Sequence, residues 1–532
     1  MSRWGRLLVG TGLAALLGSC AWRADPPGDR LVIGTRGVVN TVDPAQAHRL
    51  GALQLLQGLG EPLYAIAADG SLEPRLAAGP PQRSADGLRL RIPLREGVLF
   101  HDGSRFDAEA MAFSLRRFRD AGGALSYLIR EPVAAIHVVG PLELELELKA
   151  PYAPLERLLS FIGLTPVSPA STPPCAPERP DGSSCFQPDR FIGTGPFRLG
   201  FHSRQQQRLE RFDDYWDTPA ASAGIDVVRL NNSTALFGAL GSGEIDLLFS
   251  NGIAAEHQRA LTEQSREGRL REVVGPANGI EFFALATDRP PLDDLRLRQA
   301  LALSLDRQLI ARRVSYDLRR PLRSLLPEAS PGAIASWPAA DPAAARRLFR
   351  EAGYCDGQIL RLPLTFRSNT STDKLVALTW QAQVESDLGD CLALEPVGYE
   401  SSTIYDQLAT GAFSLVLIDW SPDFPDPENY LRPMLSCSSF EGSRCTVGEA
   451  VEGGSFWYDA TVAADLEAQQ NSRGEARLQL LRRIQQRTAT AVPYLPLWQL
   501  GNRAWASPGV EGLWFDGNGW LDLARLKRDV TP

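Results

Sequence analysis

Lysine and histidine are scarce in this chain, and no apolar run in it, including the one near the amino terminus, is long enough to span a membrane. Only three of the 532 residues are lysines (Lys149, Lys374 and Lys527), and none precedes Ser or Thr. A P-loop nucleotide site is therefore excluded, because it needs Gly-Lys-Ser/Thr to hold phosphates. The net charge of -8 also argues against a nucleic-acid-binding protein, which would need a basic face.

The motifs of common hydrolases and dehydrogenases are absent as well. The five histidines are scattered, without the i,i+4 pair of a helical zinc site, and no serine stands in Gly-x-Ser-x-Gly. The third glycine of a dinucleotide fingerprint is missing from both Gly193-Thr194-Gly195 and Gly241-Ser242-Gly243. Adjacent acids such as Asp213 and Asp214 would face different ways on a helix or strand, which argues against a glycosidase pair of carboxylates. A binding protein that is not an enzyme and needs no cofactor is the leading interpretation, with a secreted peptide hydrolase as the alternative.

The amino terminus reads as an export signal. Basic residues precede an apolar stretch from Leu7 to Leu17, which is too short for a membrane span, and Gly18-Ser19-Cys20 follows. This arrangement resembles the bacterial lipoprotein processing box. We therefore expect residues 1–19 to be a signal peptide, Cys20 to carry the lipid, and residues 20–30 to form a tether. Ordinary secretory cleavage is the alternative, and the membrane that holds the anchor, inner or outer, stays open.

The other six cysteines fit an exported protein with disulfides. Six cysteines allow about 15 pairings. Proximity in the sequence favours Cys175–Cys185 and Cys437–Cys445, which leaves Cys355–Cys391. Zinc binding by the cysteines is the alternative to disulfides, but no two cysteines have the spacing of two to four residues that structural zinc sites use. We expect no metal site.

Strand and helix patterns alternate over the whole chain. Period-two or continuous apolar patterns predict strands, with charge on the wet side of the alternating ones, at Leu31–Gly34, Leu88–Leu94 and Leu142–Leu148. Helical spacing predicts helices at Asp107–Arg119 and Arg296–Val314, and an Asp-Pro start predicts one from Asp341 to Gly353. The fold class is therefore α/β.

Nine segments then suggest a family when they are taken together and in order. They are 61–64, 69–77, 94–104, 193–198, 212–216, 240–246, 297–307, 341–354 and 420–430. The third of them, Leu94-Arg95-Glu96-Gly97-Val98 followed by Leu99-Phe100-His101-Asp102-Gly103-Ser104, is close to a family signature. Over residues 30–525 the chain resembles the extracytoplasmic solute-binding proteins of peptide-type ABC importers, the oligopeptide/dipeptide-binding family (family 5).

The resemblance implies a two-lobed periplasmic-binding-protein fold, similar to type II, with an extra domain and a hinged ligand cleft. Two strands would cross between the lobes. Lobe I would comprise 31–62, 189–277 and 489–532; the extra domain II would be 63–188, and lobe III 278–488. The resemblance also implies that some polar residues stabilise the scaffold and do not contact the ligand. They are His101, Arg298, Asp306 and Arg307.

The same resemblance implies a monomeric, lipid-anchored receptor in the periplasm or cell envelope. It would capture short peptides in the cleft and deliver them to the membrane subunits of an ABC permease. The alternatives are a non-peptide solute, such as a metal chelate, haem, an opine or a sugar, and a chaperone or sensory receptor without a permease.

Four residues are the candidate ligand contacts. By the family's Trp-x-x-Asp segment, Asp423 would receive the peptide ammonium, with Trp420 as an apolar wall; the alternative is an Asp that caps its own turn. Arg367 matches by spacing the Arg that binds the ligand carboxylate, and its planar fork suits that group. Trp498 would line a side-chain pocket, with core packing as the alternative.

Overall fold

The computed structural model describes residues 29–120, 123–170, 172, 186 and 190–529. The signal peptide, Cys20 and most of the tether lie outside these residues, as does the predicted Cys175–Cys185 pair. Nothing in the structure therefore bears on those predictions.

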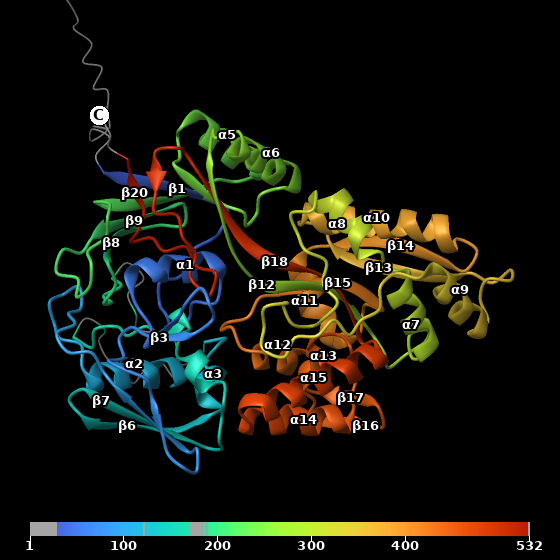
Figure 1. Cartoon of the computed structure of the whole chain (residues 1–532), viewed down its shortest axis with the longest axis horizontal. Coiled ribbons are helices and arrows are strands. Elements are labelled where there is room, and N and C mark those ends of the chain that lie inside the picture. The colour runs from blue at the N-terminus through green and yellow to red at the C-terminus, as the bar shows by residue number, and fades with distance from the viewer. Residues whose placement is uncertain (1–28, 121–122, 171, 173–185, 187–189, 530–532) are drawn as a thin grey trace, which may run out of the picture.

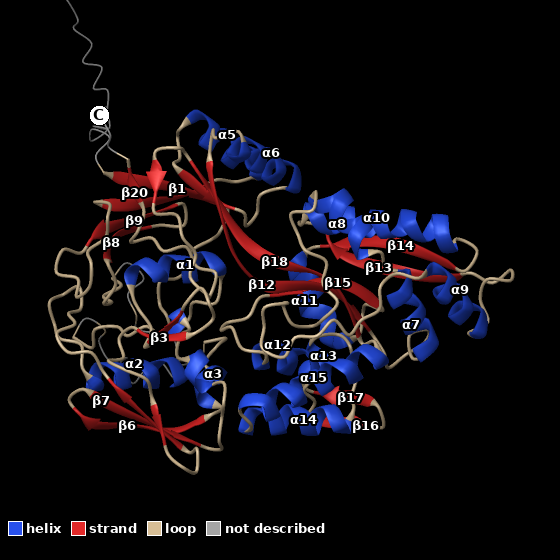
Figure 2. Ribbon diagram, in the orientation of Figure 1, coloured by secondary structure: helices blue, strands red, loops and turns tan. Residues whose placement is uncertain are grey.

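A ten-stranded mixed sheet runs through both lobes (Figures 1 and 2). The lobe I strands are β1 (Arg30–Thr35), β8 (Phe197–His202), β9 (Gln206–Arg211), β10 (Gly224–Arg229) and β11 (Leu247–Phe249). The lobe III strands are β13 (Leu360–Arg367), β14 (Leu392–Tyr399) and β15 (Leu415–Trp420). Two long antiparallel strands, β12 (Arg271–Leu285) and β18 (Tyr494–Ala506), lie between these sets and belong to both lobes. They are the crossing strands that the resemblance implied.

The two crossing strands are irregular where they pass between the lobes. Their register shifts between Val274 and Ala277 and again between Ala277 and Gly279. A Cβ atom at Gly275 would lie 2.8 Å from Cγ of Phe515, so only glycine allows the loop after β19 (Val510–Glu511) to pack here. On one side of this segment Ile280 belongs to the core of lobe III, and on the other Ala504 belongs to the core of lobe I. Since neither core extends through it, we identify this segment as the hinge.

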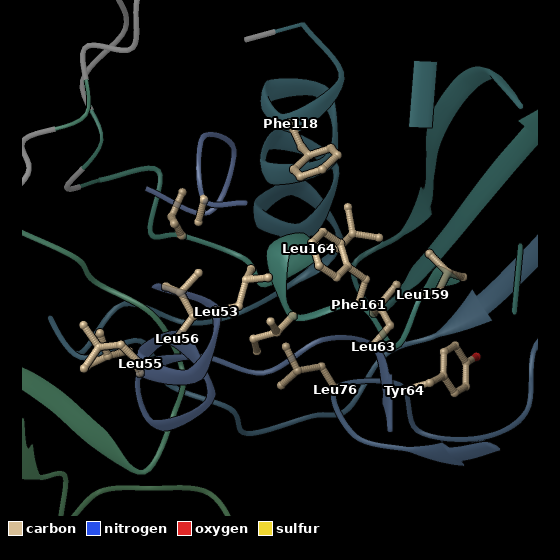
Figure 3. Close-up of a cluster of buried hydrophobic side chains, with 14 of the residues drawn as sticks. Leu53, Leu55, Leu56, Leu63, Tyr64, Leu76, Phe118, Leu159, Phe161 and Leu164 are labelled. Atoms are coloured by element: carbon tan, nitrogen blue, oxygen red, sulfur yellow. The ribbon is translucent and has the colours of Figure 1, made fainter. Parts of the chain in front are cut away.

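A second sheet forms the extra domain, with the order β4 (Gln82–Arg83), β5 (Arg89–Pro93), β7 (Glu143–Leu148) and β6 (Val133–Gly140). Helix α2 (Ala108–Asp120) packs on it through an apolar face that includes Met111, Leu115 and Phe118. The buried cluster under this sheet continues into helix α1 (Leu50–Leu59) of lobe I (Figure 3). The extra domain and lobe I therefore share one hydrophobic core, while the predicted domain bounds stay a prediction.

The remaining elements cover the sheets or connect them. In lobe I and the extra domain they are β2 (Tyr64–Ile66), β3 (Leu72–Pro74), α3 (Tyr127–Arg130), α4 (Leu155–Leu158), α5 (Ser233–Ser242), α6 (Ala255–Arg266) and β20 (Lys527–Arg528). In lobe III they are α7 (Leu295–Ser304), α8 (Arg307–Ser315), α9 (Pro342–Glu351), α10 (Ser371–Leu388), α11 (Ser401–Gln407), α12 (Glu428–Leu435), β16 (Ser439–Glu441), β17 (Arg444–Val447), α13 (Glu449–Glu452), α14 (Ala460–Asn471) and α15 (Gly474–Ala491). Within the described part of the chain, no helix combines the length and hydrophobicity needed to cross a bilayer.

Two local predictions are corrected by the structure. The single helix expected over 296–314 is two helices, α7 and α8, because Asp306 interrupts the pattern and caps α8 by accepting a hydrogen bond from the Leu309 amide at 2.9 Å. Glu145 of β7 was expected on the wet side, yet it is buried, and its carboxylate accepts a hydrogen bond from Arg91 Nε at 2.7 Å. The predicted strands and the Asp341 cap of α9 are confirmed.

Two of the polar residues expected to serve the scaffold, His101 and Arg298, hydrogen-bond carbonyl oxygens of neighbouring segments. His101 is buried, with Nε2 3.0 Å from the Gly195 carbonyl oxygen, and burial lowers its pKa to about 4. Arg298 donates to the carbonyl oxygens of Leu292 and Ala491. Two of the predicted disulfides, Cys355–Cys391 and Cys437–Cys445, are also present.

Candidate ligand-binding cleft

A cleft of about 810 Å³ lies at the hinge, between the two lobes. Lobe I contributes Arg36, the 250–254 loop and Trp520, and lobe III contributes Arg319, Asn369 and Ser421. The floor is the hinge itself, from Val274 to Gly279 and from Gln499 to Arg503. Because several of the floor residues are glycine, alanine or proline, main-chain groups border the cavity and are within reach of a ligand backbone.

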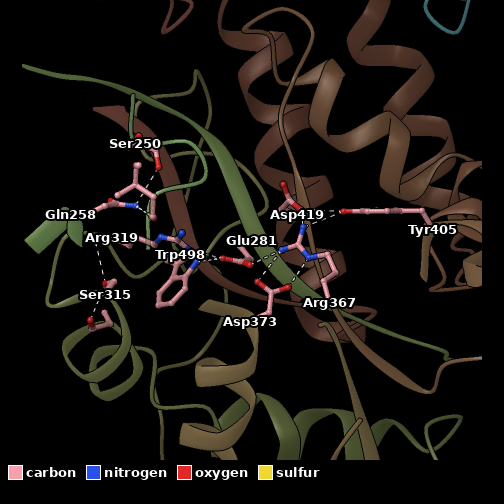
Figure 4. Close-up of polar contacts among 12 residues, drawn as sticks. Ser250, Gln258, Glu281, Ser315, Arg319, Arg367, Asp373, Tyr405, Asp419 and Trp498 are labelled. Atoms are coloured by element: carbon pink, nitrogen blue, oxygen red, sulfur yellow. Dashed lines mark hydrogen bonds and ion pairs between the residues drawn. The ribbon is translucent and has the colours of Figure 1, made fainter. Parts of the chain in front are cut away.

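Charged side chains form one part of the lobe III wall (Figure 4). We define the Glu281 cluster as Glu281, Arg319, Arg367, Asp373 and Asp419. Arg367 Nη2 lies 2.8 Å from Glu281 Oε1, and Arg367 Nε lies 2.6 Å from Asp373 Oδ2. Arg367 also forms an ion pair with Asp419, and Arg319 Nη1 lies 2.9 Å from the second oxygen of Glu281. Each of the three guanidinium nitrogens of Arg367 thus contacts a carboxylate of the protein.

The pKa shifts of the Glu281 cluster reflect its burial. It holds three carboxyl groups and two guanidinium groups, so one carboxyl is in excess. Burial and the neighbouring Glu281 carboxylate raise the pKa of Asp373 to about 8. Burial disfavours the charge of Arg367, but the Glu281 and Asp373 carboxylates outweigh this effect and raise its pKa. The excess carboxyl of the cluster therefore holds its proton more tightly than a free aspartate does.

Asp423 lies at the edge of the cleft, directly after the lining residues Ser421 and Pro422. Its side chain is half-buried, and its hydrogen-bond donors are uncharged: Asn429 Nδ2 donates to Oδ2 at 3.4 Å, and the hydroxyl of Tyr127 hydrogen-bonds the carboxylate. Among the described residues, no Lys or Arg forms an ion pair with it. Burial accordingly raises the pKa of Asp423 to about 6. The carboxylate is largely desolvated, and its hydrogen bonds come from neutral groups.

This fold and cleft agree with a family match. A family model described as "Bacterial extracellular solute-binding proteins, family 5 Middle" matches residues 71–442, more than half of the chain. The chain belongs to this family. Membership confirms the predicted family and fold class, and also the prediction that the protein binds a solute and is not an enzyme.

One curated relative and two solved structures are similar to this family 5 protein. Glutathione-binding protein GsiB of Salmonella paratyphi A is 27% identical over 334 residues, which are 62% of each chain, so the match spans less than two thirds of that relative. NikA from Brucella suis, in complex with Fe(III)-EDTA, has a TM-score of 0.81 and 24% identity over 95% of this chain and 100% of that chain. The dipeptide binding protein from Pseudoalteromonas sp. SM9913, in complex with Met-Leu, has a TM-score of 0.77 and 20% identity over 94% and 100%.

The four predicted ligand contacts of this family 5 chain take different positions. Asp423 and Trp420 adjoin the cleft; Trp420 is half-buried, and its Nε1 donates to the Asn429 carbonyl oxygen at 2.6 Å. Arg367 lines the cavity, but carboxylates of the protein surround it. Trp498 is fully buried in the lobe III core and donates to Glu281, behind the wall. The structure thus brings the residues to one region, and their roles toward a ligand stay predictions.

Sequence reasoning missed most of the charged wall. Arg36, Arg319 and Arg320 line the cleft, but they stand in no motif and are three of many arginines. Glu281 did carry a signal, because it is the only charged residue in the apolar run from Ile280 to Leu285. Among the described residues, no group of three His, Cys, Asp or Glu side chains could hold a metal ion.

Proposed function

We propose that this protein is a lipid-anchored periplasmic receptor of an ABC importer that captures short peptides with a free amino terminus. The observation that carries the proposal is the Asp423 carboxylate, which is largely desolvated at the edge of the cleft and forms no ion pair with Lys or Arg among the described residues. The lobes would close about the hinge over the peptide, and the closed form would deliver it to the permease. Cys20, after Gly18-Ser19, would provide the anchor.

The Asp423 carboxylate suits a peptide ammonium for electrostatic reasons. A buried carboxylate that meets only neutral donors has lost hydration without gaining an opposite charge, which is why its pKa is raised. A ligand ammonium would supply that charge, and Trp420 would exclude water on one side. Main-chain groups of the hinge floor would meet the peptide backbone as in strand addition, which reads no side chain.

Arginines of the cleft would bind the acidic end of the peptide. Arg36 donates to the Gly252 carbonyl oxygen at 3.0 Å and forms no ion pair within the described residues, while Arg320 has only an exposed partner, Glu328. Arg367 remains a proposed contact, although a ligand carboxylate there would have to displace one of its three acids. These cations favour a peptide with one or more carboxylates; glutathione, which the relative GsiB is named for binding, is such a peptide.

Calorimetry with matched ligands tests the proposal. We expect dipeptides or glutathione with a free ammonium to bind, and their N-acetylated forms to bind at least tenfold more weakly. Equal binding of the two forms would contradict ammonium recognition. The second candidate is an anionic chelate or other non-peptide solute, which the same arginines favour; binding of such a solute, with no peptide bound, would establish it.

Peptide affinity should depend on pH through Asp423. Its carboxyl has a pKa of about 6 in the free protein, and the proton must leave before an ammonium can bind. Affinity should therefore fall about tenfold between pH 7 and pH 5 as Asp423 gains its proton. It should also fall above about pH 8, where the peptide ammonium loses its own. Calorimetry across this range measures the effect. His48 is a histidine close to Asp423, so His48→Gln serves as the control: it should keep the profile, while Asp423→Asn should flatten it. A decline that Asp423→Asn leaves intact would assign the titration elsewhere.

A further inference from the structure

Lobe III contains a second cavity, of about 690 Å³, that the proposed function does not use. The start of helix α8 and two loop segments, 321–324 and 333–340, contribute to its walls. The chain from Arg320 to Ser324 borders both cavities: Arg320 lines the cleft, and the four residues after it line the second cavity. The second cavity is thus a separate compartment beside the cleft.

Arg307, which lines this cavity, is a buried cation without a carboxylate partner. Only 4% of the surface of this residue is exposed to solvent. Nε donates to the Pro496 carbonyl oxygen at 2.5 Å and Nη1 to that of Pro338 at 3.2 Å, while Nη2 has no hydrogen-bond partner among the described residues. Buried guanidinium groups ordinarily pair with an anion, since an unpaired one keeps its full desolvation cost.

The other charged residues around the cavity leave it with an excess of positive charge. Arg312 and Arg323 also line it, and Arg323 Nε donates to the Trp337 carbonyl oxygen at 2.6 Å. The two acids that line it have other partners, because Asp306 caps helix α8 and Glu328 lies 3.3 Å from Arg320. Burial, together with the Arg323 charge, lowers the pKa of Arg307 to about 9. An anion placed near both guanidiniums would relieve this repulsion.

Apart from Gln308 and Ser324, the uncharged part of the wall is apolar and could contact an aliphatic chain. Leu305, Leu322 and Ile334 line it, with alanines at 333, 335, 339 and 340. We propose that this cavity is a second ligand site, which binds an aliphatic carboxylate with its head group at the exposed Arg323, beside the buried charge of Arg307, and its chain along the apolar wall. A planar guanidinium fork matches a carboxylate in geometry as well as in charge.

Titration with hexanoate, followed by calorimetry on the whole protein, tests this second site. We expect hexanoate to bind, and Arg323→Ala to weaken its binding at least tenfold. The Arg323 side chain is exposed, and its loss removes one hydrogen bond within the protein, to the Trp337 carbonyl oxygen. Arg313→Ala removes an exposed charge of helix α8 that does not line the cavity, and it should leave binding unchanged. The neutral analogue 1-hexanol should bind at least tenfold more weakly than hexanoate.

Three results would overturn the second site: no binding of hexanoate, equal weakening by Arg323→Ala and Arg313→Ala, or equal binding of hexanoate and 1-hexanol. Arg307 also donates hydrogen bonds to two carbonyl oxygens of the protein, so Arg307→Lys is used only as a supporting variant. It should weaken the binding of hexanoate, because lysine lacks the planar guanidinium. A crystal soaked with 6-bromohexanoate locates the ligand through the bromine. Bromine in the interlobe cleft alone would refute the second site while leaving the peptide proposal intact.

Discussion

Replacing Arg367 with methionine is expected to lower the free energy of unfolding by about 3–5 kcal/mol. The change would leave Glu281, Asp373 and Asp419 without the guanidinium that contacts all three (Figure 4). Glu281 and Asp373 are almost fully buried, with side chains 2% and 0% exposed, so water cannot replace the lost charge. Urea unfolding at neutral pH, monitored by tryptophan fluorescence, measures the loss.

Arg361→Ala is the matched control for Arg367→Met. Arg361 lies on the same strand, β13, but its side chain is 70% exposed and pairs with an exposed Glu395 at 3.2 Å. We expect its removal to change stability by no more than about 0.5 kcal/mol, because exposed ion pairs contribute little. Similar losses for the two variants would show that the Glu281 cluster does not depend on Arg367.

Replacing Asp423 with alanine is expected to weaken the binding of a free-amino peptide at least tenfold, which corresponds to the ~2–5 kcal/mol cost of removing one partner of a buried charge pair. The peptide ammonium would enter the cleft without its counter-charge, while Trp420 and the hinge floor would be unchanged. The N-acetylated peptide should not distinguish the variant from the wild type. Calorimetry with both peptides measures the two affinities.

Asp406→Ala provides the control for Asp423→Ala, because Asp406 is an exposed acid of the same lobe on helix α11. Its loss should leave peptide affinity unchanged. If Asp423 instead only organises its own turn through Asn429, Asp423→Ala should lower the free energy of unfolding without changing peptide affinity. That outcome would remove Asp423 from the ligand site and leave the family assignment standing.

Residues whose environment is set within a few positions were predictable from the sequence. The Asp341 cap of α9 and the β5 and β7 strands follow from local spacing, and the Cys437–Cys445 pair follows from proximity. Such features depend on hydrogen bonds and side-chain periodicity over one or two turns, which the chain carries wherever it folds. The family could be predicted for a similar reason, because its short segments recur in a fixed order.

Long-range contacts decided the rest, because charge pairing depends on which strands become neighbours. From the sequence alone, Arg367 is predicted to be free to bind a ligand carboxylate. In the folded protein, strands β12 and β15 place Glu281 and Asp419 against it. Arg307 reads as an ordinary surface cation of a helix until folding buries it with Nη2 unpartnered. Sequence alone determined the kind of molecule, namely a two-lobed binding protein. Only the tertiary structure decided which charges are left over for a ligand, since a charge is satisfied or spare according to what lies within about 4 Å of it in space.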